Sequence, residues 1–295
     1  MFLKEENKGI LSLVLLAWIF ATMGVFARYL STDFELFEQT YLRIGLAFLL
    51  GCILFVHKID VRKICAASKK DLLILAFRAV TLYLGVVLFT EAILSTAYGN
   101  ASFVASLPLM PLLGYILLRE TLKMRTLLYI LLSFIGVALI AITDFSTMKI
   151  GYGEVVALLS LVSFDLSYIA RRWHSDYLNN YESAVVIFGI GALFLFLTSM
   201  ILGENLPTVD QFSLSIVAVL LIAAIFNVAN LLLTNYGFAH VKVAVATNIL
   251  TLEVVFALAY GIFLFKEIPV LREVLGGALI LYSVYMVNRL ESSNK

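Results

Sequence analysis

Long apolar stretches separated by short polar segments follow one another along the whole chain. Each has about the twenty residues that an α-helix needs to cross the hydrocarbon core of a bilayer. They fall roughly at residues 10–30, 36–56, 72–94, 98–118, 125–143, 153–170, 183–203, 214–236, 243–265 and 270–288. The pattern predicts an all-α integral membrane protein with ten transmembrane helices.

The composition supports a membrane protein over a soluble one. Of the 295 residues, 62% are hydrophobic and 14% are charged, against about 50% and 25% in soluble domains. A bilayer accepts such a chain when each span satisfies its backbone as a helix. The net charge of +1 gives no reason to expect a nucleic-acid partner.

Lysine and arginine residues are concentrated in alternate connecting segments. If the N-terminus lies inside, the inner segments include Lys58, Arg62 and Lys63, and the basic residues of the outer segments are Lys149, Lys266 and Arg272. Inner loops carry the excess of basic residues in membrane proteins. We therefore expect a multi-pass protein with both termini cytoplasmic, in a bacterial plasma (inner) membrane.

Two segments far apart in the chain match in spacing. The sequence GYILLRETLKMR at 114–125 aligns with GIFLFKEIPVLR at 261–272 after a shift of 147 positions (261 − 114). The shift places Gly114 on Gly261, Glu120 on Glu267 and Arg125 on Arg272. Chance similarity between two leucine-rich helices is the alternative to a duplication.

A duplication divides the chain into two five-helix repeats, at 1–147 and 148–295. Because five is an odd number, the second repeat enters the membrane from the opposite face, and the two form an inverted-topology repeat. Two such halves can exchange conformations, so that one central site opens alternately to each side. The repeat therefore indicates transport.

The motifs YLRIGLAFLLG, FRAVTLYLGVVLFTEAI, PLLGYILLRE and LEVVFALAYGIFLFKE resemble those of EamA-type members of the drug/metabolite transporter superfamily. The resemblance covers nearly the whole chain. It implies an exporter or exchanger of small metabolites, with a pathway among the first, third, fourth, sixth, eighth and ninth helices. The chain departs from the family where Val254 follows Glu253, because a proline is frequent there.

Ionisable side chains at membrane depth are candidates for function because they are costly there without a partner or a wet cavity. Arg78 and Asp165 lie at similar depths and are candidates for a gating ion pair, and Arg78 is also a candidate for binding a substrate carboxylate or phosphate. Arg43 and Glu91 form a second candidate pair towards the external side. A static ion pair, or an Arg78 that snorkels to the interface, is the alternative.

Glu253 lies about ten residues into the ninth stretch, near the midplane at about 1.5 Å of rise per residue. A carboxyl at that depth can bind and release a proton as access alternates, which makes Glu253 the candidate for proton coupling. A Glu253 that stays protonated or hydrogen-bonded is the other interpretation.

Polar side chains form stripes on the later helices. Asn227, Asn230 and Thr234 fall at i, i+3 and i+7, and therefore on one helical face. Asn248 and Thr251 begin a similar pattern. A buried carboxamide needs partners for two donors and an acceptor, so we assign these residues to the substrate pathway, with close helix packing as the alternative.

Aromatic and glycine residues complete the set of candidates. Trp18, Tyr83 and Tyr168 are candidates for stacking on a substrate, although aromatic residues in spans often pack or anchor at the interface. Gly276 and Gly277 open a small-residue surface that is a candidate for a homodimer contact.

The residues favour a secondary transporter of small polar metabolites, such as amino acids or their derivatives. It would work by alternating access at a central cavity between the repeats. A flippase for lipids or lipid headgroups is the second hypothesis. An intramembrane enzyme is the third, but the three histidines, His57, His174 and His240, lie at the ends of spans, so that we expect no enzyme. We expect neither a cofactor nor a metal site, because Cys52 and Cys65 lack the spacing of zinc ligands.

Overall fold

The computed structural model describes residues 5–96, 98–105, 107, 109–119, 123–142, 151–173, 175, 177–265 and 270–292. These residues form α-helices and short 3-10 turns, and no strand occurs among them. The predicted turn residues Glu120, Lys266 and Glu267 lie outside the described residues.

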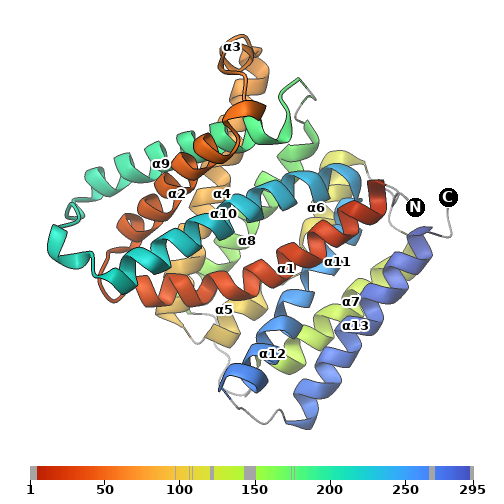
Figure 1. Cartoon of the computed structure of the whole chain (residues 1–295). Helices are drawn as coiled ribbons and strands as arrows, with labels where there is room; N and C mark the ends of the chain where they lie inside the picture. Colours follow the sequence, from red (N-terminus) through yellow and green to blue (C-terminus); the bar gives the residue numbers. More distant parts are fainter. Residues whose placement is uncertain are drawn as a thin grey trace.

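The helices of the first half are α1 (Glu5–Leu30), α2 (Leu36–Leu54), α3 (Val61–Cys65), α4 (Lys69–Ser95), α5 (Tyr98–Ala105), α6 (Leu109–Leu118) and α7 (Met124–Ala141). Those of the second half are α8 (Tyr152–Ala170), α9 (Asn180–Leu202), α10 (Leu214–His240), α11 (Val243–Leu250), α12 (Leu252–Phe265) and α13 (Leu271–Ser292). Figure 1 shows them as one bundle, from which α3 projects.

Within the described ranges, seven segments are long and apolar enough to cross a membrane. They are Glu5–Ala27, Leu36–Leu54, Lys69–Ser95, Tyr152–Trp173, Asn180–Leu202, Leu214–His240 and Val243–Tyr260. Phe103–Leu118 and Met124–Ile140 are shorter apolar helices, and α13 carries charged residues near both ends. The seven spans confirm a multi-pass, all-α membrane protein, while the full set of ten remains a prediction.

The long helices pack in pairs that join the two halves of the chain (Figure 1). The most extensive packing is between α4 and α8, α7 and α13, α1 and α10, and α2 and α9. Each pair takes one helix from each half. In the predicted repeat α1 corresponds to α8 and α4 corresponds to α10, so that the α1–α10 pair matches the α8–α4 pair. The pairs α2–α9 and α7–α13 each consist of two corresponding helices.

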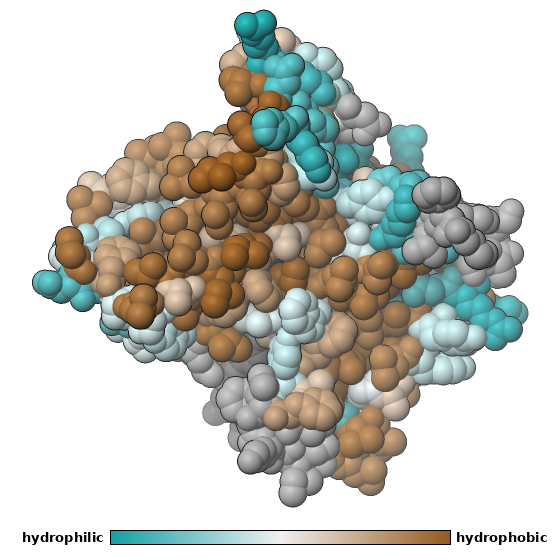
Figure 2. Space-filling model, in the orientation of Figure 1, coloured by the Kyte–Doolittle hydropathy of each residue, from teal (hydrophilic) through white to brown (hydrophobic). Residues whose placement is uncertain are grey.

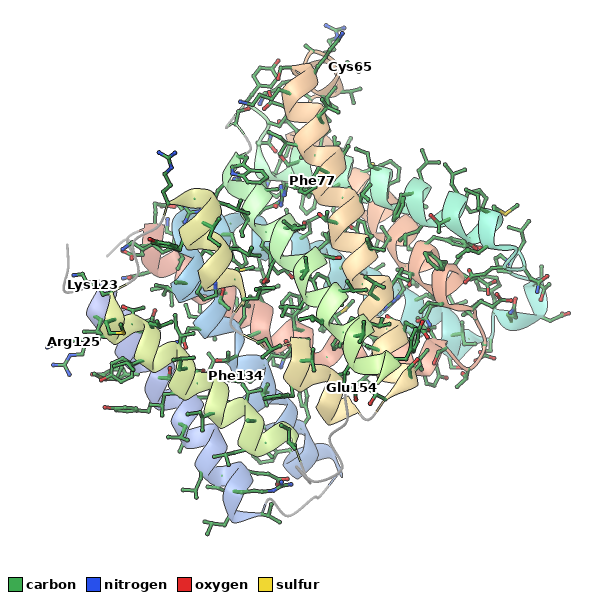
Figure 3. All side chains as sticks on the ribbon, turned by 180° about the vertical axis from the view of Figure 1, so that it is seen from behind. Cys65, Phe77, Lys123, Arg125, Phe134 and Glu154 are labelled. Carbon is green, nitrogen blue, oxygen red and sulfur yellow. The ribbon has the colours of Figure 1, made fainter. Side chains whose placement is uncertain are left out.

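Helices α7 and α13 cross at two glycines. A Cβ added at Gly276 would lie 2.6 Å from the backbone oxygen of Gly136, and a Cβ at Gly136 would lie equally close to the oxygen of Gly276. Phe134, two residues before Gly136 on α7 (Figure 3), stacks on Phe103 of α5 with ring centroids 4.9 Å apart. Gly276 therefore packs inside the chain, and a Cβ at Gly277 would lie 3.9 Å from Cδ2 of Leu258 on α12. Both glycines of the predicted dimer surface are buried within the chain.

Two further close approaches resemble one another. Near the start of α8, a Cβ at Gly153 would lie 2.6 Å from Cβ of Thr96, the C-cap residue of α4. Near the start of α1, a Cβ at Gly9 would lie 2.9 Å from Cγ2 of Val241, the C-cap residue of α10. In each case the first helix of one half, α8 or α1, packs against the end of the third long helix of the other half, α4 or α10.

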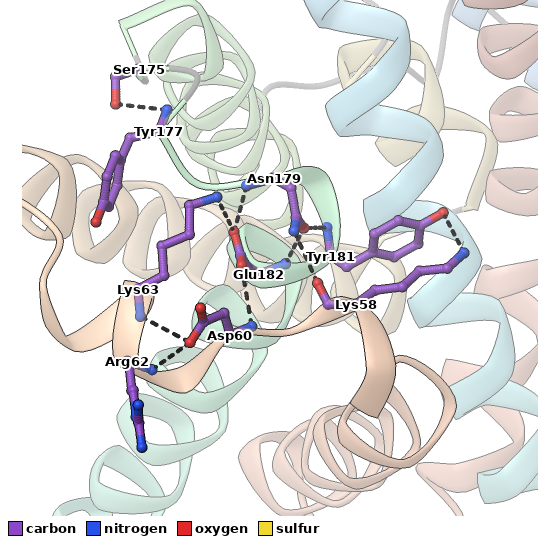
Figure 4. A network of polar contacts seen from close by, with 9 residues as sticks. All are labelled: Lys58, Asp60, Arg62, Lys63, Ser175, Tyr177, Asn179, Tyr181 and Glu182. Atoms are coloured by element: carbon purple, nitrogen blue, oxygen red, sulfur yellow. Dashed lines mark hydrogen bonds and ion pairs between the residues drawn. The ribbon is translucent and has the colours of Figure 1, made fainter.

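The connection between α2 and α4 is clamped to the start of α9 (Figure 4). Nζ of Lys63 forms an ion pair of 3.1 Å with buried Glu182, whose other carboxylate oxygen accepts a hydrogen bond from the backbone of Asp60. Asn179 caps α9 and donates through Nδ2 to the backbone oxygen of Lys58, 3.0 Å away.

A carboxylate clamps the start of α2 in the same manner. Glu204, in the connection after α9, accepts hydrogen bonds from the backbone N–H groups of Phe37 and Glu38, at 3.0 and 2.9 Å. Each of α2 and α9 thus begins beside the end of the other. The two helices therefore pack antiparallel.

The outer surface is apolar over the long helices and hydrophilic at the projecting α3 segment (Figure 2). Exposed apolar side chains on α1, α9 and α10 include Leu15, Leu197 and Ile225. This belt is the surface that lipid covers in a membrane. The only two cysteines, Cys52 and Cys65, are unpaired.

Candidate functional site

A cavity of about 470 Å³ lies at the centre of the bundle. Residues from both halves line it, and they come from α1, α4, α8, α10 and the broken pairs α5–α6 and α11–α12, with single contributions from α2, α7 and α9. The elements that the family resemblance assigns to a pathway are thus the main elements around the cavity.

Helix breaks bring polar groups to this cavity. Helix α11 ends at Leu250 and α12 begins at Leu252, with Thr251 between them. The hydroxyl of Thr251 donates to the backbone oxygen of Asn248 at 2.6 Å and lies 2.8 Å from the hydroxyl of Ser133. The break places Glu253 in the first turn of α12, where it lines the cavity.

The cavity wall contains three charged side chains, Arg43, Asp165 and Glu253. Asp165 is buried, and its Oδ2 atom has no hydrogen-bond partner. Arg43 bonds within its own helix, through Nε to the backbone oxygen of Gln39 at 3.3 Å and through Nη2 to Oγ1 of Thr40 at 3.4 Å.

Neither of the predicted ion pairs is formed. Glu91 accepts a hydrogen bond of 2.9 Å from Ser95 on its own helix and does not line the cavity. It forms no ion pair with Arg43, which bonds within α2. Nη2 of Arg78 donates to Oδ1 of Asn235 at 2.5 Å, and Arg78 has no ion pair with Asp165. The pairs were predicted from similar depth along the sequence, which does not determine the direction in which a side chain points.

The polar stripe on α10 does reach the cavity. Asn227 and Asn230 line it. Thr234 does not, but its hydroxyl donates to Oδ1 of Asn230 at 3.2 Å. Asn235 was missed by the sequence reasoning, although it stands eight residues after Asn227 and therefore fits the same helical spacing.

The remaining candidates divide between the cavity and other places. Thr251 and Tyr83 line the cavity, and the ring of Tyr83 packs so tightly on α9 that a Cβ at Gly191 would lie 2.0 Å from it. Asn248 is buried outside the lining and accepts a hydrogen bond from Ser283 on α13. Trp18 is 40% exposed on the outer surface and packs against Phe226, so that it does not contribute to the cavity.

Aromatic rings form much of the cavity wall, and the sequence reasoning did not identify most of them. They are Phe20, Phe89, Phe164, Tyr168 and Phe188. Tyr168 lies in a stack between Phe164 and Phe238, with ring centroids 6.1 and 4.9 Å away. No pattern in the sequence separates these rings from the many aromatic residues that face lipid.

Several apolar spans around one cavity with buried charges define the chain as a multi-pass membrane protein with an internal site. The model of the EamA-like transporter family matches residues 7–142 and 151–289. The chain therefore belongs to the EamA-like transporter family, as its motifs indicated, and is a membrane transporter.

Individual proteins agree with this assignment. A protein of Archaeoglobus fulgidus named as an uncharacterized transporter is 26% identical over 286 residues, which are 95% of this chain and 96% of that protein. A protein of known crystal structure has the same fold, with a TM-score of 0.76 at 14% sequence identity over 97% of this chain and 98% of that one. The family and the relative's name point to transport rather than to catalysis.

Proposed function

We propose that the protein is a secondary transporter that exports or exchanges small polar metabolites, such as amino acids or their derivatives, by alternating access. The observation that carries this proposal is the central cavity, where aromatic rings surround Asn227, Asn230, Asp165 and Glu253. The aromatic rings would pack against the apolar part of a substrate, and the amides and carboxyls would bind polar groups on the same molecule. Because nearly all the long helices contribute to its wall, the cavity favours a soluble substrate over a lipid.

The mechanism that we propose uses ten transmembrane helices in two inverted five-helix repeats, at 1–147 and 148–295. The helix pairs that exchange with one another support it, as do the matching approaches at Gly9 and Gly153 and the matching clamps at α2 and α9. Halves related in this way can exchange shapes, and the exchange would open the cavity to one side and then to the other.

For orientation, we propose that both termini lie in the cytoplasm and that the membrane is a bacterial plasma membrane. Helix α1 begins and α13 ends on the same side of the molecule (Figure 1). The basic segment around α3 would lie on the cytoplasmic face, in keeping with the excess of positive charge there.

Uptake into proteoliposomes tests the proposed function. The purified protein would be offered labelled amino acids, nucleoside derivatives and quaternary amines, with and without a pH gradient. We expect saturable uptake of at least one amino acid or derivative, and faster uptake when the same compound is loaded inside. Uptake of every compound at the rate of protein-free liposomes would contradict the proposal.

Coupling to protons has its own prediction. Replacing Glu253 with Gln keeps the shape and hydrogen bonding of the side chain but removes its ability to bind and release a proton. We expect Glu253→Gln to retain uptake and to lose its dependence on pH. Initial rates of uptake measured from about pH 5.5 to about pH 8.5 check this.

Two matched variants accompany that measurement. Glu91→Gln removes a carboxyl that does not line the cavity and should keep the wild-type pH profile. Asp165→Asn removes the other carboxyl of the cavity, whose wall Tyr168 shares with both carboxyls. A profile that moves with Asp165→Asn and not with Glu253→Gln would transfer the role to Asp165.

A further inference from the structure

The side chain of Arg78 is the largest that is fully buried, with 1% of its surface exposed. Its Nη2 atom donates to Oδ1 of Asn235, but Nε and Nη1 have no hydrogen-bond partner. Nδ2 of Asn235 has none either. Three donors therefore lie together in the protein interior without an acceptor.

The charges around Arg78 do not offset the free-energy cost of burying its guanidinium. Arg78 forms no ion pair with any described carboxylate, and a second cation, Arg171, contacts the same asparagine, Asn235. Arg171 donates to the backbone oxygen of Asn235 at 3.3 Å. A buried charge with unsatisfied donors costs several kcal/mol, and an anion is the group that would remove that cost.

The cluster lies at the end of the cavity nearest Arg171. On α4, Arg78 stands five residues before Tyr83, which lines the cavity, and on α10 Asn235 stands five residues after Asn230, which also lines it. Five residues correspond to about 7.5 Å along each helix. Thr234 bonds to Asn230 and so continues the polar face of α10 from the cavity towards the cluster.

Contacts between three helices close this end. The hydroxyl of Ser167 on α8 donates to the backbone oxygen of Arg78 on α4 at 2.9 Å, while Arg78 and Arg171 both hold Asn235 on α10. Movement of these helices to open the inner side would break those contacts. It would also free Nη2 of Arg78 from Oδ1 of Asn235.

We infer that Arg78 and Asn235 form a binding site for an oxyanion, which is the carboxylate of a transported substrate. The guanidinium fork offers two parallel N–H groups to the two oxygens of a carboxylate, and the amide of Asn235 adds a third donor. This inference rests on the proposed function. Inorganic phosphate has similar chemistry and is the alternative source of the anion.

An internal anion gives the first test. In Asn235→Asp, a carboxylate replaces the amide beside Arg78 and supplies the missing acceptors. We expect the purified full-length protein in detergent to melt at a higher temperature than the wild type. The double variant Arg78→Gln/Asn235→Asp should lose this gain. Asn227→Asp, which places a carboxylate on the same helix away from Arg78, should melt at a lower temperature.

Added ligands give the second test. The probes are 3-phenylpropionate, phenethylamine and inorganic phosphate at constant ionic strength, the first two sharing one aromatic body. We expect 3-phenylpropionate to raise the melting temperature of the wild type, and Arg78→Gln to weaken its apparent affinity roughly tenfold to a hundredfold. Asn235→Asp should also remove the effect, and Arg62→Gln, at an exposed arginine, should not. Neither variant of the cluster should change the response to phenethylamine.

Other outcomes would overturn the inference. If Asn235→Asp lowers the melting temperature as much as Asn227→Asp does, Arg78 does not bind an anion at position 235. Stabilisation by phosphate alone would overturn the assignment to a substrate carboxylate, as would a carboxylate effect that survives Arg78→Gln. Uptake without an Arg78-dependent anion effect rejects this inference alone, and an anion effect without any uptake rejects the proposed function alone.

Discussion

Replacing Gly276 with alanine is expected to destabilise the protein, whereas the same replacement at Gly277 should have little effect. The new methyl group at 276 would lie 2.6 Å from the backbone oxygen of Gly136 and 2.8 Å from the side chain of Ile140. A backbone atom cannot rotate away, so that α7 and α13 must separate. Overpacking of this kind costs about 1–3 kcal/mol, and the melting temperature of the purified protein in detergent measures it.

Gly277 is the matched control because it is the next residue on the same helix and would place its Cβ 3.9 Å from the nearest atom, a side-chain carbon of Leu258. Gly136→Ala should reproduce the loss seen for Gly276→Ala, since each glycine faces the backbone of the other. Equal melting temperatures for the variants at 276 and 277 would mean that the α7–α13 crossing is not as close as described.

Replacing Asn230 with leucine is expected to abolish transport, with uptake reduced at least tenfold. Leucine has the same branched arrangement of non-hydrogen side-chain atoms but has no donor or acceptor, so that the cavity loses a polar group that lines it. Thr234 would lose the acceptor of its hydroxyl at the same time. A lost hydrogen bond to a buried polar partner costs about 1–3 kcal/mol. The initial rate of uptake per inserted protein measures the effect.

Membrane insertion has to be measured beside transport, because only a correctly inserted variant is informative. We expect wild-type amounts of Asn230→Leu in the membrane, since leucine is more favourable than asparagine in a span. Asn205→Leu, in the exposed connection between α9 and α10, is the control and should transport normally. Wild-type uptake by Asn230→Leu would remove the α10 stripe from the pathway.

Apolar stretches of spanning length predicted most of the helices because each helix must cover a fixed bilayer thickness. They did not predict the interruptions, where α5 ends at Ala105 and α6 begins at Leu109, and where Thr251 separates α11 from α12. The first break contains Pro108, which has no N–H to donate within a helix, and the second lies at Thr251, between Asn248 and Glu253. Local bonds satisfy part of the backbone there, from the N–H of Leu107 to the oxygen of Val104 and from the N–H of Val254 to the oxygen of Thr251. The hydrophobic pattern continues through both places and therefore did not mark them.

The candidate site was predictable where residue spacing defines a face. Asn227 and Asn230 were found because amides at i and i+3 share one side of a helix. Trp18 was misplaced because α1 is apolar on all sides, and its sequence does not distinguish the side towards the cavity from the side towards lipid. The contact of Arg78 with Asn235 depends on how α4 and α10 are rotated about their axes, which residue spacing within one helix does not give.

Alternating access is tested most directly with a cysteine at the cavity wall, after Cys52 and Cys65 have been replaced. Val86→Cys places a small thiol on α4 in the cavity lining, and Leu84→Cys, on the outer side of the same helix, is the control. We expect a membrane-impermeant thiol reagent to label Val86→Cys both in right-side-out and in inside-out vesicles, and to leave Leu84→Cys unlabelled. Labelling of Val86→Cys from one side only, under every substrate condition, would contradict the account.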